Sequence, residues 1–225
     1  MDKLLIWDID GTLINGSGTG KKAMNTAFSI LYGIEGGLDA IDLAGRLDSS
    51  ILLEAYKIHG LPALDTTHFF DEYCVYLKEY IENLGFSIVL PGVIRLLEST
   101  LQKGYCCNAL GTGNIERGAR IKLSFEDLNR FFPVGGFGDE AKERFQVIEN
   151  AISNSCEYYN KSFEKQNIYV IGDTPKDIEC AVLLGTKSIG VATGRYTQNE
   201  LIEAGAYKVL ENLENPDAFF EIIAS

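Results

Sequence analysis

Short apolar runs that alternate with helix-like segments constrain the fold of this chain most strongly. Such runs occur at residues 4–7, 105–110, 168–171, 187–191 and 207–210. Strand–helix alternation of this kind predicts an α/β fold with a Rossmann-like, doubly wound parallel sheet. In such folds, ligands bind beyond the carboxyl ends of the strands. The residues that follow each run are therefore the first place to look for a site.

Two of the intervening helices are predicted from apolar spacing together with proline and glycine. One covers residues 91–103 and has Gly104 just past its end. The other has Thr174 as its cap and Pro175 as its first residue, and Gly185 follows its end. Proline near a helix start and glycine after its end are the usual boundary signals.

Residues 18–84 interrupt the alternation. They read as three helices with no convincing strand between them, around residues 19–32, 49–59 and 66–83. We therefore expect an α/β core domain of residues 1–16 and 88–225, with an α-helical cap domain of residues 17–87 inserted after the first strand. Hinges are expected near residues 15–18 and 86–91. A helical insertion at the carboxyl edge of the sheet would act as a lid.

The composition narrows the range of partners. A formal net charge of −12 disfavours binding to nucleic acid or to an acidic membrane surface, because no broad basic field attracts polyanions. The five cysteines lack metal-ligand spacing and are expected to be free thiols. We find neither a signal-peptide pattern nor a run of membrane-spanning length, so a cytoplasmic location is expected.

The segment KLLIWDIDGTLINGSGTGKK, residues 3–22, could serve either of two kinds of phosphate chemistry. A phosphate-cradling loop needs G-x-x-x-x-G-K-[ST], but Asn15 stands at the first glycine and Lys22 at the Ser or Thr. The alternative uses carboxylates, because Asp8 ends a strand and Asp10 begins a turn with Gly11. Taken alone, this pair is equally well explained as a turn with an Asx cap.

Further polar residues stand at other strand ends. Thr112 follows the run at 105–110, Asp173 follows the run at 168–171, and Asp177 lies in the first turn of the next helix. Because parallel strands share one carboxyl edge, these side chains are expected to converge with Asp8 and Asp10. Carboxylates this close repel one another unless a cation neutralises them, and Mg²⁺ suits an all-oxygen ligand set.

In these motifs the sequence resembles the haloacid dehalogenase superfamily, specifically its phosphatase-like members with a helical cap, such as phosphoglycolate phosphatases and beta-phosphoglucomutases. The first motif, D-x-D-G-T, is residues 8–12, the second is Thr112, and the fourth, G-D-x-x-x-D, is residues 172–177. The resemblance covers essentially the whole chain. Dehalogenases of this superfamily lack the second aspartate, so Asp10 favours phosphoryl transfer over cleavage of a carbon–halogen bond.

The resemblance implies a role for each matching residue. Asp8 would be the nucleophile that carries a transient aspartyl phosphate, and Asp10 would be the general acid and base. Asp8, the backbone carbonyl of Asp10 and Asp173 would hold Mg²⁺, with Asp177 in support. Thr112 and the neighbouring groups of Gly113 and Asn114 would bind the phosphoryl oxygens.

The third motif departs from the family pattern, which usually has a lysine paired with the nucleophile. The segment at 135–152 lacks the usual Lys-Pro, and Arg144 is the better match, with Lys142 as the alternative. In the insertion, Arg46 is the expected contact for a substrate anion, while Asp48 and Ser49 are expected to cap their own helix. The two histidines both fall in the insertion and are expected to be ordinary cap residues.

These observations favour a Mg²⁺-dependent phosphatase acting on a small phosphorylated metabolite. A phosphomutase of the beta-phosphoglucomutase type uses the same parts, although Thr12 leans towards hydrolysis because some mutases have a bulky aliphatic residue there. A phospho-acceptor regulatory domain also clusters aspartates at a sheet edge, but it needs neither Asp10 nor a lid. Substrate identity and oligomeric state stay open.

Overall fold

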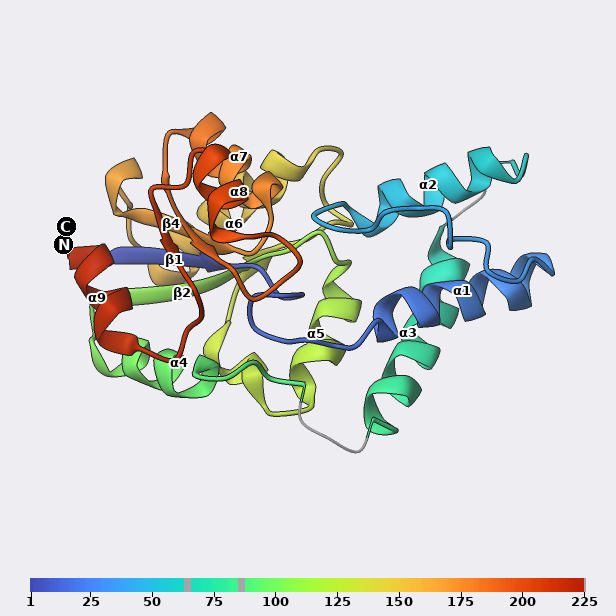
Figure 1. The fold of residues 1–225 in the computed structure, drawn as a ribbon, viewed down its shortest axis with the longest axis horizontal. Coiled ribbons are helices and arrows are strands. Elements are labelled where there is room, and N and C mark those ends of the chain that lie inside the picture. The colour runs from blue at the N-terminus through green and yellow to red at the C-terminus, as the bar shows by residue number, and fades with distance from the viewer. Residues whose placement is uncertain (63–65, 85–87, 225) are drawn as a thin grey trace.

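A six-stranded parallel sheet forms the centre of the computed structural model, which describes residues 1–62, 66–84 and 88–224 (Figure 1). Within these ranges the strand order is β3-β2-β1-β4-β5-β6, and every pairing is parallel. The strands are β1 (Lys3–Trp7), β2 (Cys106–Gly111), β3 (Gly135–Gly136), β4 (Ile168–Gly172), β5 (Lys187–Val191) and β6 (Lys208–Leu210). The predicted α/β class and parallel sheet are confirmed.

The edge strand β3 has no apolar run, and for this reason the sequence did not predict it. Its Gly136 lies directly against the backbone of α6, so that a Cβ there would collide with the carbonyl of Val147. The backbone of α6 therefore packs directly against this strand. Because both residues of β3 are glycines, the strand has no side chains that could give a hydrophobic pattern in the sequence.

Helices cover both faces of the sheet and also form the segment that follows β1. They are α1 (Thr19–Tyr32), α2 (Asp48–Ile58), α3 (Thr67–Glu82), α4 (Val93–Gln102), α5 (Glu116–Ser124), α6 (Arg144–Tyr159), α7 (Pro175–Leu184), α8 (Gln198–Glu203) and α9 (Pro216–Ala224), with 3₁₀ turns at Leu128–Phe131 and Lys165–Asn167. The predicted boundaries of α7 hold. Helix α4 begins two residues later than expected, because Gly92 has φ 83° and is outside the right-handed helical region.

The central strand β1 is buried on both faces. Leu5 and Trp7 pack into the core beneath α4 and α9, whereas Leu4 and Ile6 pack beneath α6 and α7. This alternation follows from the two-residue period of a strand. Trp7 also stacks on Phe219 of α9, with ring centroids 5.4 Å apart. The strand that carries Asp8 is thus held rigidly in the middle of the molecule.

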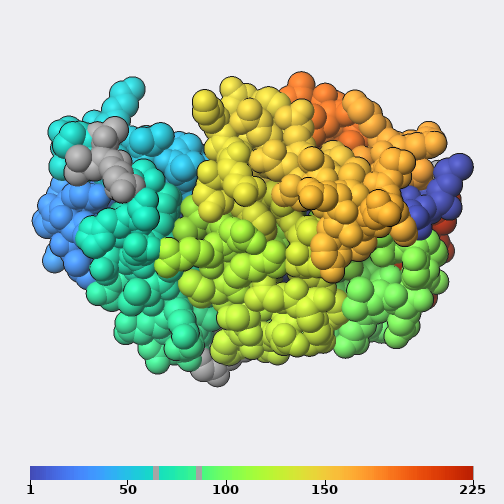
Figure 2. Space-filling model, turned by 180° about the vertical axis from the view of Figure 1, so that it is seen from behind, coloured from blue at the N-terminus to red at the C-terminus, as the bar shows by residue number. Residues whose placement is uncertain are grey.

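The chain between β1 and α4 leaves the sheet and forms a helical lobe at one end of it. Helices α1 and α3 pack against each other, with Phe28 and Phe69 in edge-to-face contact. Figure 1 shows α1, α2 and α3 together beyond the strand ends, and Figure 2 shows this lobe, blue to teal, beside the core. The described residues of the lobe contain no named strand.

Parts of the predicted cap and hinge lie outside the described residues, namely 63–65 and 85–87. The proposed cap of residues 17–87 accordingly stays a prediction in its boundaries. Of the helices in the described part of the chain, none combines the length and apolarity needed to cross a membrane.

Candidate active site

Three neighbouring strands bring the predicted motifs together at one edge of the sheet. Trp7 is in register with Leu110 of β2 on one side and with Ile171 of β4 on the other. The next residues along these strands therefore stand side by side, and the Asp8 amide donates to the Ile171 carbonyl over 2.9 Å. The helical lobe closes over this edge and leaves a cavity of about 470 Å³.

The cavity collects almost all of the predicted site residues. Its lining includes Asp8, Asp10, Arg46, Thr112, Gly113, Asn114, Arg144 and Asp173. Asp177 lies behind it, in the first turn of α7. The alternative basic residue, Lys142, is exposed to solvent and is not part of this lining.

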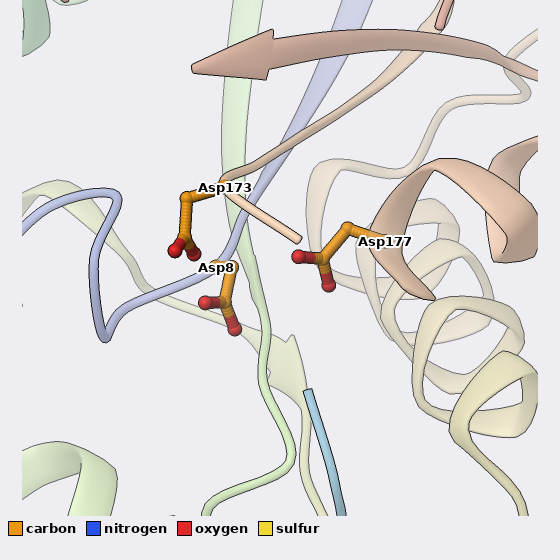
Figure 3. A group of neighbouring side chains, drawn as sticks. All are labelled: Asp8, Asp173 and Asp177. Carbon is orange, nitrogen blue, oxygen red and sulfur yellow. The ribbon is translucent and has the colours of Figure 1, made fainter. Parts of the chain in front are cut away.

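Three carboxylates, those of Asp8, Asp173 and Asp177, converge at the wall of the cavity. One oxygen from each lies within 4.8 Å of the others, and all three residues are buried. Figure 3 shows Asp8 and Asp173 side by side at the ends of their strands, with Asp177 pointing back towards them from α7. Burial and repulsion from Asp177 raise the pKa of Asp8 to about 7, although Arg144 opposes this. Burial and repulsion from Asp8 raise the pKa of Asp173 to about 8.

This donor set fits a hard divalent cation. All of the converging atoms are carboxylate oxygens, and the raised pKa values of Asp8 and Asp173 reflect burial together with repulsion between neighbouring negative charges. Asp177 is already engaged, because its Oδ1 accepts from Arg144 and its Oδ2 from the Thr174 hydroxyl over 2.7 Å. The freer oxygens belong to Asp8 and Asp173. These two residues could therefore hold a divalent cation directly, and Asp177 is placed to orient Arg144.

Arg144 is the cationic side chain that contacts the acidic cluster. Its Nη2 donates to Asp8 Oδ1 over 2.9 Å and to Asp177 Oδ1 over 2.7 Å, and its side chain is 11% exposed. Nη1 forms no hydrogen bond with the described residues, and it lies near the Cα of Gly113 at the cavity wall. One arm of the guanidinium therefore holds the carboxylates, while the other is free for an incoming anion.

Asp10 belongs to a second hydrogen-bonded group on the other side of the cavity. Its Oδ2 accepts from Lys122 Nζ over 2.5 Å and from Asn114 Nδ2 over 2.8 Å. Asn114 Nδ2 also donates to the Thr112 hydroxyl over 2.7 Å. Partial loss of solvation raises the pKa of Asp10, but the Lys122 charge and the hydrogen bonds from Lys122 and Asn114 outweigh it and leave this pKa below its usual value.

Sequence reasoning missed Lys122. The residue lies on α5 between Ala119 and Leu123, both fully buried, at a position of the helix that faces the core. Its side chain is only 6% exposed. A lysine on the apolar face of an amphipathic helix was the available signal, since a buried ammonium requires a partner.

The predicted capping role of Asp48 and Ser49 is wrong. Asp48 Oδ2 accepts from the Ile115 amide over 3.0 Å, at the start of α5, and the Ser49 hydroxyl donates to the Gly138 carbonyl over 3.2 Å. Both side chains therefore tie the lobe to core loops, and their own helix has no side-chain cap. The backbone amide of Asp48 also donates a hydrogen bond to the Gly113 carbonyl over 2.8 Å.

Two arginines lie at the mouth of the cavity. Arg46 pairs with Glu54 over 2.6 Å and keeps a partly exposed side chain in the cavity lining. Arg195, from the loop after β5, makes a two-point ion pair with Asp42 of the lobe at 3.0 and 2.7 Å. The histidines take no part here: His59 hydrogen-bonds the Gly37 carbonyl within the lobe, and His68 is exposed.

Comparison with known proteins extends these observations. A phosphoglycolate phosphatase of Pseudomonas syringae pv. tomato is 25% identical over 234 residues, which cover 95% of this chain and 78% of the relative. The structure of a hydrolase from Pseudomonas syringae is 21% identical, covers 100% of both chains and superposes with a TM-score of 0.69. A mutant of CbbY from Rhodobacter sphaeroides, in complex with xylulose-(1,5)bisphosphate, is 17% identical with a TM-score of 0.73 over 96% of each chain.

The family assignment rests on a separate match. The sequence model of the haloacid dehalogenase-like hydrolases matches residues 5–191, which reach from β1 to the end of β5 and include all of the strand ends described above. The solved structures share the same fold at identities too low to carry more than that. This chain belongs to the haloacid dehalogenase-like hydrolase family.

Proposed function

We propose that this protein is a Mg²⁺-dependent phosphatase that hydrolyses a small phosphorylated metabolite through a phosphate ester of Asp8. The observation that carries this proposal is the meeting of Asp8 with Arg144 on one side of the cavity and Asp10 on the other. A cavity of about 470 Å³ suits a small molecule. The phosphoglycolate phosphatase relative supports a substrate of this class.

In the first step, Asp8 attacks the phosphorus atom. Its Oδ1 is held by Arg144, whereas its Oδ2 forms no hydrogen bond with the described residues and is the attacking atom. As the new oxygen–phosphorus bond forms, the ester bond breaks and Asp10 gives its proton to the leaving oxygen. The lowered pKa of Asp10 opposes this protonation, but a bound phosphate dianion raises the pKa of a neighbouring carboxyl group.

In the second step, water attacks the phosphorus of the aspartyl phosphate. Asp10, now a carboxylate, takes a proton from that water, the Asp8–phosphorus bond breaks, and inorganic phosphate leaves. The Thr112 hydroxyl, the amides of Gly113 and Asn114, and the free arm of Arg144 would hold the phosphoryl oxygens in both steps. Mg²⁺, held by Asp8, Asp173 and the Asp10 carbonyl, would neutralise charge on the phosphoryl group.

The helical lobe would cover the active site and recognise the substrate. Its residues Asp42, Asp48 and Ser49 contact three different core loops, so the described arrangement is a closed one. Closure over the cavity excludes bulk water from the phosphoryl group. Arg46 is the residue of the lobe best placed to bind a second anionic group of the substrate.

Release of inorganic phosphate tests the proposal. We expect the purified protein to release phosphate from an aryl phosphate and, faster, from one or more of a panel of phosphorylated metabolites with Mg²⁺, and EDTA should suppress the reaction. Inactivity across the whole panel while Asp8 is intact would contradict it. A phosphomutase would instead convert a sugar phosphate to its isomer without net phosphate release, which the same panel distinguishes by product analysis.

A further inference from the structure

Lys122 is a buried cation beside the proposed acid–base residue. Its side chain reaches from α5 to the cavity wall and is 6% exposed, whereas the Asp10 side chain is 48% exposed. Burying an ammonium group is costly unless charged or polar partners replace its water. The steps proposed above assign no task to Lys122, so its placement calls for a separate explanation.

The contacts of Lys122 form a closed set with two neighbours. Nζ donates to Asp10 Oδ2 over 2.5 Å and to Asn114 Oδ1 over 2.6 Å, and Asn114 Nδ2 donates to the same Asp10 Oδ2 over 2.8 Å. Two donors therefore hold one oxygen of Asp10 from two directions. Asp10 Oδ1 forms no hydrogen bond within the described ranges, and it is the oxygen left for the cavity.

We propose that Lys122 is a positioning residue that, together with Asn114, holds Asp10 Oδ2 so that Oδ1 faces the leaving oxygen of the substrate. This inference rests on the proposed function, because it assumes that Asp10 exchanges a proton with the leaving group. The Lys122 side chain is 6% exposed, and two of its three N–H groups are directed at Asp10 and Asn114, so we assign it no direct contact with the substrate. Its effect on the reaction passes through the orientation of Asp10.

The leaving group gives a selective test. A p-nitrophenolate ion leaves without a proton, whereas the alkoxide of benzyl alcohol requires one, and the two phosphate esters are similar in size. Lys122→Met should lower kcat/KM for benzyl phosphate by about 10²-fold, within the range of general acid–base effects, and lower kcat/KM for p-nitrophenyl phosphate by only a few-fold. This ratio reports phosphoryl transfer to Asp8, whereas the second step is shared by both esters and affects kcat alike. Asp10→Asn should show the same preference, and the double variant should lose little more than Asp10→Asn alone.

A matched control and a second measurement make the test decisive. Lys78→Met removes a lysine on α3 whose side chain is 66% exposed and paired with Glu82, and it should change neither rate. A crystal structure of the Lys122→Met protein should show the Asp10 carboxylate rotated away from Asn114. Melting curves establish that each variant is folded.

Several results would overturn the inference. They are equal losses of kcat/KM on the two esters, no loss on either, losses that simply add in the double variant, and an Asp10 carboxylate that stays in place in the crystal. If the wild-type protein hydrolyses neither these esters nor any member of the panel, the proposed function fails. The position of Asp10 in the variant crystal then decides the positioning role by itself.

Discussion

Replacing Arg144 with methionine tests whether the acidic cluster depends on one cation. The Arg144 side chain is 11% exposed and bridges Asp8 and Asp177 with bonds of 2.9 and 2.7 Å. Methionine retains much of the volume of arginine, so the change removes charge and hydrogen bonds without opening a large cavity. Arg144 Nε has no hydrogen-bond partner in the described structure, so the groups that lose a donor are Asp8 Oδ1 and Asp177 Oδ1.

The expected loss in the free energy of unfolding follows from the burial of the ion pairs that Arg144 makes with Asp8 and Asp177. Removing one partner of a buried ion pair costs about 3–5 kcal/mol, because the remaining charge is left uncompensated. The free energy of unfolding of an ordinary domain is about 5–15 kcal/mol, so Arg144→Met should destabilise the folded state without abolishing folding. The rate of phosphate release should fall by about 10²-fold or more, because a charged donor to the phosphoryl group is lost.

The loss of stability should depend on pH. Burial and the charge of Asp177 raise the pKa of Asp8 to about 7, above its ordinary value of 3.8, even though Arg144 lowers it. Between these values the folded state retains a proton that the unfolded chain releases, so stability falls as pH rises. Without Arg144 the folded pKa rises further, and this fall continues above pH 7. The effect of the substitution should therefore be larger at about pH 8 than at about pH 5.

Urea unfolding in EDTA, at about pH 5 and about pH 8, measures this difference. Arg130→Met, which removes a surface arginine paired with Glu98 and Asp127, serves as a control and should change stability by less than about 0.5 kcal/mol. Mg²⁺ should restore part of the loss at the higher pH. Equal losses at both pH values, or a wild-type stability at pH 8, would refute the reasoning.

Three further predictions concern single residues. Asp8→Asn should abolish phosphate release while leaving a folded protein by circular dichroism; wild-type turnover in this variant would remove Asp8 as the nucleophile. Asp48→Asn should be more favourable to stability at about pH 8 than at about pH 5, because burial raises the pKa of Asp48 from 3.8 to about 7, and the stability that the wild-type carboxyl group contributes falls as pH rises between these values. Urea unfolding tests this, and an effect independent of pH would contradict it. Arg46→Ala should raise KM for the preferred metabolite more than for an aryl phosphate. Equal increases in the two KM values would show that Arg46 does not contribute to substrate recognition.

The parts of the fold that were predictable from sequence are those with strong local signals. Strands β1 and β4 are continuous apolar runs, and α7 carries proline at its start and Gly185, with φ 70°, after its end. The convergence of Asp8 and Asp173 followed from the shared edge of parallel strands. Strand β3 could not be predicted, because its two glycines serve helix packing and carry no hydrophobic pattern.

Residues whose partners are distant in sequence were harder to place. Asp48 stands at the start of a helix, where local rules favour a cap, but the amide of Ile115 competes successfully for its carboxylate. Lys122 is 112 positions from Asp10 along the chain, and no local pattern joins them. The sequence already favoured Arg144 over Lys142, and the structure puts Arg144 beside Asp8 and Lys142 in solvent.

The insertion of α1, α2 and α3 directly after β1 has an evolutionary consequence. Both ends of this segment join the core close together, since Ile14 bridges to Val89, so its length and sequence can vary without disturbing any strand pairing. In the proposed reaction, the groups that would break the ester bond belong to the core, while those that would meet the rest of the substrate belong to the inserted segment. A change of substrate would then require changes in the inserted segment only, and the residues proposed to carry the reaction could stay as they are.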